Sequence, residues 1–436
     1  MASVAPFCGI RYHHDLAQDL ARLITPPYDV ISPADQEHLY RAHPNNIIRL
    51  ELGRTLPGDN ATENRYTRAS RFYRQWLAQG ILQKEDRPAF YLYRQEFTID
   101  GTPKIRTGII GAVKIEPYEK KVILPHEETL SSAKADRLEL MRACRASFSP
   151  IFGLYADPTG TLDELLARVA AREAAASCTD DEGHKHALWL ITEDDETDAI
   201  AAGLADKQIF IADGHHRYET AQTYQKERGE TPPDAPWHFV MMTLVNLYDP
   251  GLVILPTHRL IKNLPGLDFA AFLASLASNF LIAEYRLGDG GSLDHFLTML
   301  QATGAEGRHA FGLCADGANL YLLVLKNTVD PDRVLGPGRS AAWRRLDVAI
   351  LQSLVLERLL GIDETACRQG EFLSYTRDAG EAMAALAAGT HQLAFLLNAT
   401  PVTSVTAVAQ SGEKMPQKST FFYPKLMTGL VMYAMD

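Results

Sequence analysis

One segment in the middle of the chain, Gln208–Arg228, constrains the fold more than any other part of the sequence. Its first residues, Gln208-Ile-Phe-Ile-Ala212, are almost all apolar and predict a buried strand. Asp213–His216 follows as a turn, in which Gly214 permits a backbone conformation that other residues rarely adopt. A helix is expected to begin at Arg217. The segment therefore predicts a strand, a tight turn and a helix in direct succession.

This turn has the chemistry of an anion-binding site. The first turn of a helix has free N–H groups and a partial positive charge, which together favour a bound anion. His215, His216 and Arg217 add protonatable donors and a forked cation that suits a phosphate. Neighbouring helical residues diverge by about 100°, so we expect one histidine to serve the ligand and the other to pack. Asp213 could hold Mg²⁺, act as a base or simply cap the helix, and Arg217 could instead pair with a surface carboxylate.

The sequence Asp213-Gly-His-His-Arg217 after a strand resembles the phosphate-binding turn of the ParB/sulfiredoxin superfamily. Sulfiredoxins carry Gly-Cys-His-Arg at this place. The chain lacks that reactive cysteine, which argues against sulfinic-acid repair. ParB proteins carry an acidic-plus-arginine version of this turn and bind cytidine triphosphate and DNA. The free-serine kinases of the superfamily carry a closely similar Asp-Gly-His-type motif.

More specifically, the chain is identified as a member of the DUF1015 family by motifs spread over most of its length. The matching segments are Pro26-Pro-Tyr-Asp-Val-Ile31, His126-Glu127, Ser149-Pro-Ile-Phe152, Ile211–Ala221, Leu255-Pro-Thr-His-Arg259 and Met415–Leu426.

The resemblance implies an α+β or mixed α/β fold, with a ParB/sulfiredoxin-like N-terminal region and a second α/β region. It also implies phosphoryl transfer from a nucleoside di- or triphosphate, with Mg²⁺, to a hydroxylated metabolite such as serine. In this interpretation Asp213 holds the metal, Gly214–Arg217 bind the phosphate, and Glu127, His216 and Asp213 are catalytic. Two alternatives stay open: a ParB-like nucleotide switch or DNA-associated module, and a non-catalytic anion-binding protein.

Further charged groups are candidates for the same chemistry. Glu127, beside a turn, could serve as the general base, or it could cap a helix. Lys134 and Arg137 share one face of a predicted helix and could line an anion pocket, or they could form a solvated charged face. Lys418 lies in a turn-rich tail with Lys414 and Lys425, and we expect Lys418 to contact phosphate.

Three other groups are further candidates. Asp29 could contact a substrate amine or a metal, although the neighbouring prolines could simply shape a turn around Tyr28. Glu51 is a further carboxylate, placed at the end of a predicted strand. His258 and Arg259 follow an apolar run, and loops after strands often bind ligands in α/β folds. The sequence contains no Walker-type phosphate loop and no GxGxxG motif.

Composition narrows the class of protein. Of 436 residues, 46% are hydrophobic and 22% are charged, which is the balance of a globular protein. The net charge of −11 disfavours general nucleic-acid binding, because phosphate contacts dominate that affinity. Five scattered cysteines predict reduced thiols, and neither a leader nor a membrane span is visible. We expect a cytoplasmic protein whose partners are a nucleotide and a small molecule, with a homo-oligomer as one option.

The length predicts more than one domain. We expect a phosphate-binding domain over residues 1–261 and a second α/β domain over 262–436, whose tail returns towards the site. Helices are predicted at 33–43, 61–79, 131–146, 161–176, 195–205, 217–228, 268–279, 290–302, 344–360 and 378–388. Strands are predicted at 47–52, 89–99, 105–117, 150–155, 188–192, 208–212, 239–246, 252–259, 309–314, 319–326 and 391–398.

Overall fold

The computed structural model describes residues 1–288 and 291–436, which form two compact units. Unit 1 comprises Met1–Pro125, Thr129–Val253 and Pro424–Asp436, and unit 2 comprises His126–Glu128 and Ile254–Tyr423. The division differs from the predicted boundary at residue 261, because strand β14 (His258–Ile261) pairs with β18 (Leu373–Thr376) and β19 (Leu393–Leu397) inside unit 2.

Unit 1 is built on a mixed sheet, which confirms the predicted α+β class. The strands follow the order β6-β11-β8-β12-β5-β4-β10-β9, with β1 paired to β5. Strand β8 is parallel to β12 and antiparallel to β11, while β11 is parallel to β6. Their bounds are β1 (Val4–Ala5), β4 (Phe90–Ile99), β5 (Thr102–Lys114), β6 (Ile123–Leu124), β8 (Ile151–Tyr155), β9 (Ala176–Thr179), β10 (Lys185–Ile191), β11 (Ile209–Asp213) and β12 (Phe239–Asn246).

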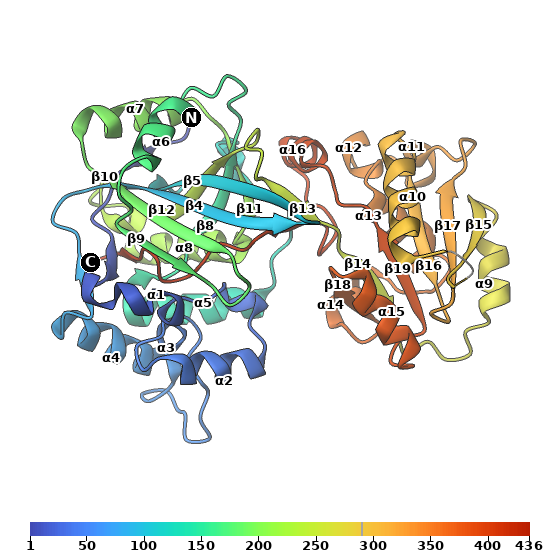
Figure 1. The fold of residues 1–436 in the computed structure, drawn as a ribbon, viewed down its shortest axis with the longest axis horizontal. Helices are drawn as coiled ribbons and strands as arrows, with labels where there is room; N and C mark the ends of the chain where they lie inside the picture. Colours follow the sequence, from blue (N-terminus) through green and yellow to red (C-terminus); the bar gives the residue numbers. More distant parts are fainter. Residues whose placement is uncertain (289–290) are drawn as a thin grey trace. The chain divides into compact units, whose positions relative to one another are not determined.

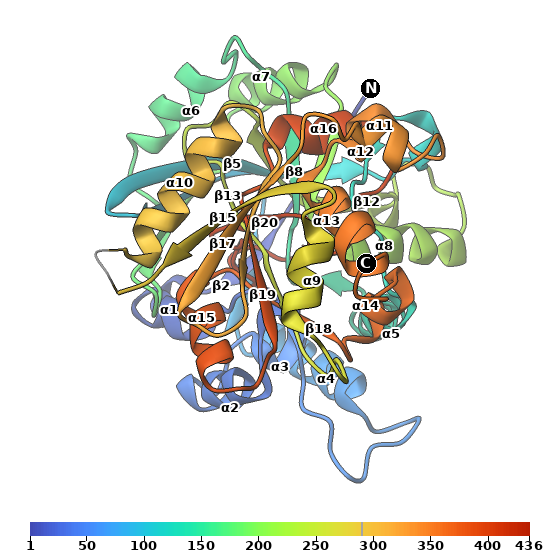
Figure 2. The same ribbon diagram turned by 90° about the vertical axis from the view of Figure 1, so that its right-hand side faces the viewer.

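The helices of unit 1 lie to either side of this sheet. Figures 1 and 2 show α1 to α5 on one side and α6 and α7 on the other. Helix α2 begins as predicted, because Ser32 and Asp35 form a reciprocal capping box around Pro33. The bounds are α1 (Leu20–Leu23), α2 (Pro33–Ala42), α3 (Ile48–Glu51), α4 (Arg65–Ala78), α5 (Ser131–Cys144), α6 (Asp163–Ala170), α7 (Asp194–Leu204) and α8 (His215–Arg228).

The hairpin between β4 and β5 confirms a local prediction. Asp100 and Gly101 both have positive φ, 49° and 73°, as a two-residue type I′ turn requires. The predicted strand over residues 47–52 is wrong, because Ile48–Glu51 form helix α3. The side chain of Asn46 accepts a hydrogen bond from the backbone N–H of Ile48 at 2.8 Å and starts this helical turn.

Unit 2 contains an antiparallel sheet in the order β15-β17-β16-β19-β14-β18. Apolar side chains fill both of its faces, with Phe311 and Phe395 in one core cluster and Phe296 and Leu396 in another. The strands not yet placed are β15 (Phe280–Arg286), β16 (Ala310–Cys314) and β17 (Asn319–Leu325). A short pair, β13 (Val253–Leu255) and β20 (Phe421–Tyr423), lies outside this sheet.

The helices of unit 2 agree in part with prediction. Those that cover the sheet include α9 (Phe269–Leu276), α10 (Leu293–Ala305), α13 (Asp347–Leu351), α15 (Ala379–Ala387) and α16 (Val402–Gln410). The helix predicted over 344–360 is divided, since α13 passes into a π-helix over Gln352–Glu357. The predicted start at residue 290 lies outside the described residues. Within the described ranges, every helix is too short or too polar to cross a membrane.

Candidate anion-binding site

The turn after β11 has the predicted backbone. Gly214 is the N-cap of α8 with φ of 89°, and α8 begins at His215 rather than at Arg217. A Cβ atom at Gly214 would lie 3.0 Å from Nε of Arg217. Any other residue at this position would therefore have a strained backbone and a close contact with Arg217. The N-cap offers no side-chain acceptor to α8, and its first turn carries no acidic residue. The positive end of this helix is therefore not neutralised by its own first turn.

Asp213 does not cap α8. One of its carboxylate oxygens accepts the N–H of Gly214 at 2.8 Å, and the other accepts the ammonium group of Lys425 at 2.8 Å. Burial alone would raise the pKa of Asp213, but the charges of Lys425 and Arg217 outweigh burial and hold this pKa well below its ordinary value. A carboxylate so stabilised is a weak general base at neutral pH. The structure therefore favours a positioning role for Asp213 over proton abstraction.

Lys425 is held in place through its backbone. The side chain of Gln95, on β4, donates to the carbonyl oxygen of Lys425 at 3.0 Å. Arg106, which faces Gln95 across the β4–β5 pair, donates to the carbonyl of Pro424 and to the amide oxygen of Gln95. Gln95 and Arg106 are each 1% exposed. We call these two residues the carbonyl clamp, because they fix the segment from which the Lys425 side chain extends.

Arg217 and the two histidines have different surroundings. Arg217 donates through Nη1 to the carbonyl of Pro150, while its buried Nε has no acceptor among the described residues. His215 is 3% exposed, and its charge would help to lower the pKa of Asp213. Nε2 of His216 accepts the backbone N–H of Leu130 at 2.9 Å. This hydrogen bond ties the ring to the start of α5.

Lys134 and Arg137 are both engaged by carboxylates. Lys134 lies 2.8 Å from Glu219. Arg137 is 5% exposed and contacts both Glu51, at 3.2 Å, and Asp136. The predicted solvated face is therefore wrong for Arg137, because the burial of its guanidinium requires these paired charges. As phosphate ligands the two residues stay a prediction, and each would have to exchange its carboxylate partner.

The Pro26–Ile31 motif lies beside Arg137. The guanidinium of Arg137 lies 4.1 Å from the ring centre of Tyr28. Burial raises the pKa of Tyr28 far above its ordinary value, while the charges of Arg137 and Arg217 oppose that shift. Tyr28 is therefore a protonated phenol at neutral pH, within electrostatic reach of Arg217. Two motifs far apart in the sequence, around Tyr28 and around Arg217, are neighbours in unit 1.

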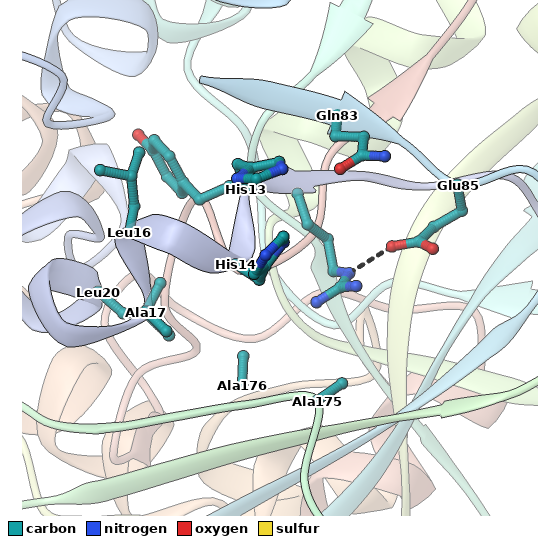
Figure 3. A pocket seen from close by; sticks show the side chains of 11 residues that line it. His13, His14, Leu16, Ala17, Leu20, Gln83, Glu85, Ala175 and Ala176 are labelled. Atoms are coloured by element: carbon teal, nitrogen blue, oxygen red, sulfur yellow. Dashed lines mark hydrogen bonds and ion pairs between the residues drawn. The ribbon is translucent and has the colours of Figure 1, made fainter. Parts of the chain in front are cut away.

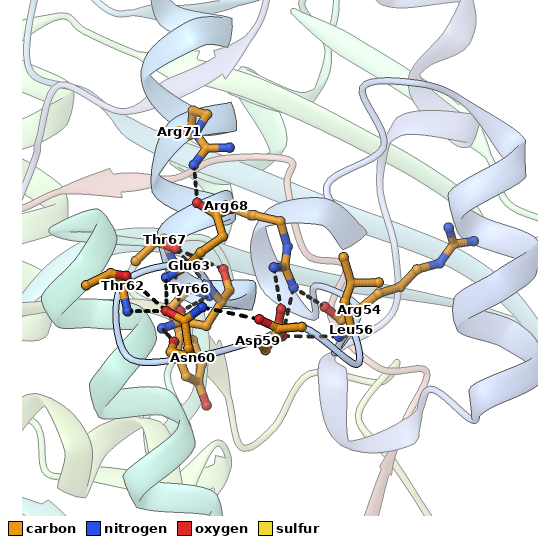
Figure 4. Close-up of polar contacts among 12 residues, drawn as sticks. Arg54, Leu56, Asp59, Asn60, Thr62, Glu63, Tyr66, Thr67, Arg68 and Arg71 are labelled. Atoms are coloured by element: carbon orange, nitrogen blue, oxygen red, sulfur yellow. Dashed lines mark hydrogen bonds and ion pairs between the residues drawn. The ribbon is translucent and has the colours of Figure 1, made fainter.

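A loop before α4 supports this region. In Figure 4, Asp59 pairs with Arg68 at 2.6 Å, and the side chain of Asn60 accepts the backbone N–H groups of Thr62 and Glu63. The loop leads into α4, whose first residue, Arg65, pairs with Asp136. Asp136 also pairs with Arg137, whose guanidinium lies over the ring of Tyr28.

Glu127 and Lys418 belong to unit 2, where they contact each other. The backbone N–H of Lys418 donates to a carboxylate oxygen of Glu127 at 3.3 Å, and Lys418 has a positive φ of 54°. Arg259, 4% exposed, donates to the carbonyl of Lys418 at 3.2 Å. His126 is 1% exposed and lies 3.0 Å from the hydroxyl of Thr420. The motifs around these residues therefore meet in unit 2, and the catalytic role of Glu127 and the phosphate role of Lys418 stay predictions.

Comparison with known proteins identifies the family. The family model described as "Protein of unknown function (DUF1015)" matches residues 4–349, more than half of the chain. The chain belongs to the DUF1015 family. The resemblance found in the sequence motifs is thus confirmed at the level of the family, whereas the ParB/sulfiredoxin relationship stays a prediction. No curated protein matches the sequence.

Solved structures similar to this DUF1015 protein include a free serine kinase in complex with AMP, at 14% identity and a TM-score of 0.34, covering 71% of this chain and 89% of the kinase. A complex of a free serine kinase variant with ADP is 14% identical, with a TM-score of 0.36 and coverage of 75% and 93%. A conserved hypothetical protein from Pyrococcus furiosus is 15% identical, with a TM-score of 0.35 and coverage of 75% and 97%. Identities and TM-scores this low carry no argument about function. The function of the DUF1015 chain is therefore argued from its own residues.

The residues around Asp213 do not form a ready Mg²⁺ site. Magnesium prefers several oxygen ligands in octahedral geometry. Asp213 is held instead among the cationic groups of Lys425 and Arg217, and within residues 1–288 and 291–436 the one cluster of at least three candidate ligand side chains is elsewhere, at His13, His14 and Asp15. The donor set of this DUF1015 site therefore fits an anion rather than a dication. The metal role predicted for Asp213 finds no support in these surroundings.

Proposed function

We propose that the β11–α8 turn of unit 1 binds a phosphate group of a nucleotide, and that the protein transfers a phosphoryl group to a small hydroxylated metabolite. The observation that carries the proposal is the convergence of Lys425 and Arg217 on the uncapped N-terminus of α8. Helix N-termini bind anions, and cationic side chains beside them add to that attraction.

The balance of charge at the turn supports an anionic ligand. Asp213 contributes one negative charge, whereas Lys425 and Arg217 contribute two positive charges, and His215 adds a third when protonated. Arg217 uses Nη1 on the carbonyl of Pro150, which fixes its plane, and its Nε finds no acceptor in the described parts of the chain. A phosphate oxygen at Nε would satisfy this buried N–H, which is costly to leave unpaired.

Phosphoryl transfer fits a site of this composition. The reaction depends mainly on positioning and on stabilising charge at the transferred phosphoryl group. The acceptor hydroxyl oxygen forms a bond to phosphorus while the bridging P–O bond of the nucleotide breaks, and a base takes the hydroxyl proton. Lys425, fixed by the carbonyl clamp, would stabilise the developing negative charge. Because the pKa of Asp213 is low, the base is a different group.

A screen for nucleotide consumption tests the proposal. The purified full-length protein would be incubated with ATP or ADP, with Mg²⁺, and with a panel of hydroxy amino acids and sugars. We expect an acceptor-dependent loss of nucleotide, and a decrease of at least about tenfold for Arg217→Lys, because lysine cannot reproduce the fork. Lys185→Met, at a lysine that is 69% exposed, is the matched surface control.

Other outcomes would overturn the proposal. Full activity of an Asp213→Asn, His216→Ala double variant would place the reaction elsewhere. Nucleotide binding without turnover for any acceptor would support the alternative of a non-catalytic anion-binding protein. Robust binding of DNA at physiological salt would contradict a metabolic role, since the net charge of −11 opposes such binding.

A further inference from the structure

A second polar site lies in unit 1, at a pocket of about 130 Å³. It is bordered by β2 (Ile10–Tyr12), by β3 (Leu82–Lys84) and by the 3₁₀ helix η1 (His14–Asp19). Figure 3 shows the imidazole rings of His13 and His14 at this pocket, together with Glu85. Glu85 forms an ion pair with Arg11, which also lines the pocket. None of the residues of the anion-binding turn lines this pocket.

Three consecutive residues, His13, His14 and Asp15, place two imidazoles and a carboxylate close together. Nδ1 of His13 lies 3.3 Å from one oxygen of Asp15, and Nε2 of His14 lies 3.2 Å from the other. The two ring centres are 4.1 Å apart. One ligand atom from each of the three side chains lies within 4.8 Å of the other two. His13 precedes the 3₁₀ helix as its N-cap residue, with φ of −59° and ψ of 145°.

These spacings match those of metal ligands. Zinc holds nitrogen and oxygen ligands at about 2.0–2.2 Å, so two ligands on a tetrahedral ion are about 3.3 Å apart. The distances from His13 and from His14 to the two different oxygens of Asp15, 3.3 and 3.2 Å, are close to that value. Imidazole and carboxylate together are typical ligands of Zn²⁺, Co²⁺ and Ni²⁺.

The arrangement of lone pairs in the cluster also favours a bound cation. The backbone N–H of Asp15 donates to Nδ1 of His13 at 3.3 Å, so this nitrogen presents a lone pair. A carboxylate oxygen of Asp15 faces the same nitrogen, and two lone-pair atoms attract each other only through a positive charge between them. The nearby charge of Arg11 is already matched by Glu85 at 2.6 Å. A divalent cation placed between these two atoms would therefore be stabilised by both of them.

We propose that His13, His14 and Asp15 bind a divalent transition-metal ion of the zinc class, with the remaining coordination positions open to solvent and to the pocket. Three protein ligands plus an exchangeable fourth position is the arrangement of sites that act on a ligand, whereas structural zinc sites are closed by four protein ligands. The site is independent of the anion-binding turn and of the function proposed for that turn.

Titration calorimetry of the untagged full-length protein with ZnCl₂, and Co²⁺ absorption spectra, would test this proposal. We expect one equivalent of Zn²⁺ per chain and a tetrahedral Co²⁺ spectrum. Loss of one ligand in His14→Ala should weaken binding by at least about tenfold. The side chain of His14 is 80% exposed, so the variant should fold normally. His38→Ala removes another exposed histidine, 70% exposed and paired with Asp181 at 3.6 Å, and should leave the affinity unchanged.

Two results would overturn the proposal. One is the absence of stoichiometric Zn²⁺ binding by the wild-type protein. The other is an equal loss of affinity in the His14 and His38 variants, which would indicate non-specific binding to surface histidines. Asp15→Asn provides a second measurement, because it keeps the shape of the side chain and removes its charge. Nucleotide consumption measured in the same variants keeps this test separate from that of the anion-binding turn.

Discussion

The ammonium nitrogen of Lys425 lies 2.8 Å from a carboxylate oxygen of Asp213, although 212 residues separate the two along the chain. The pair joins the end of β11 to the C-terminal segment of unit 1. Both side chains are largely buried, Asp213 at 18% exposed and Lys425 at 13%. Each charge therefore depends on the other to offset its loss of hydration.

Replacing Lys425 with methionine should destabilise the protein. The substitution leaves the Asp213 carboxylate without its ammonium partner, and breaking a buried pair from one side costs on the order of 3 kcal/mol. Denaturant unfolding of both single variants and of the Asp213→Asn, Lys425→Met double variant would measure the coupling. If the losses in the single variants add up fully in the double variant, the pair contributes no coupling energy.

The pH dependence of the free energy of unfolding should reveal the contribution of the Asp213–Lys425 pair. The pKa of Asp213 is lower in the folded protein than the ordinary value of about 3.9 that applies when the chain is unfolded. Between those two values the unfolded chain binds more protons, so stability rises with pH and is fully present above pH ~4. We expect unfolding curves between pH 2.5 and 5 to show a shallower acid-side slope in Asp213→Asn than in the wild type. An unchanged slope would contradict the assignment.

The carbonyl clamp should be needed for both stability and anion affinity. Gln95→Leu removes the donor to the Lys425 carbonyl and one acceptor of the buried Arg106, at a cost of about 2 kcal/mol. Gln75→Leu, at an exposed position on α4, is the matched control. Thermal unfolding measures the first effect, and binding of inorganic phosphate or ADP measures the second. Wild-type anion affinity in Gln95→Leu would show that the clamp does not position Lys425.

A buried histidine should make unit 2 sensitive to acid. Burial lowers the pKa of His258 to about 4, and the ring accepts the backbone N–H of Leu397 at 3.1 Å. Since the unfolded value is about 6.5, the unfolded chain binds more protons between pH 4 and 6.5. Stability should therefore fall by about 3 kcal/mol as pH decreases through this window.

Hydrogen exchange of peptides from β19, corrected for the intrinsic pH effect, would detect this loss locally. His258→Asn keeps a short acceptor for Leu397 and removes the titrating ring, so its protection should change less between pH 6.5 and 4. Equal acid sensitivity in the variant and the wild type would exclude His258 as the cause.

The sequence predicted the local features of the candidate site well. The apolar run before Asp213, the glycine at positive φ and the helix after it depend on neighbouring residues, and the structure contains all three. Lys425 could not be singled out among the tail lysines, because its partner lies far away in the sequence. Its position is set by Gln95 and Arg106, two residues of a distant hairpin that no local pattern connects to the tail.

Two differences between the predicted and the observed secondary structure have physical causes. The apolar–polar alternation of residues 47–52 suits a strand, but a run this short also fits one helical turn, and the cap from Asn46 decides for the helix. Strand β15 (Phe280–Arg286) was missed because it is an edge strand with mostly exposed side chains, and its pairing with β17 supplies what its own pattern lacks.

The division of the chain also has a consequence for biosynthesis. Residues 424–436 complete unit 1, yet the ribosome makes them only after all of unit 2. Until then β7 (Ala146–Ser147) lacks its partner β21 (Tyr433–Ala434), and the β11–α8 turn has no lysine. A nascent chain would therefore lack both of these contacts in unit 1 until residues 424–436 have been made.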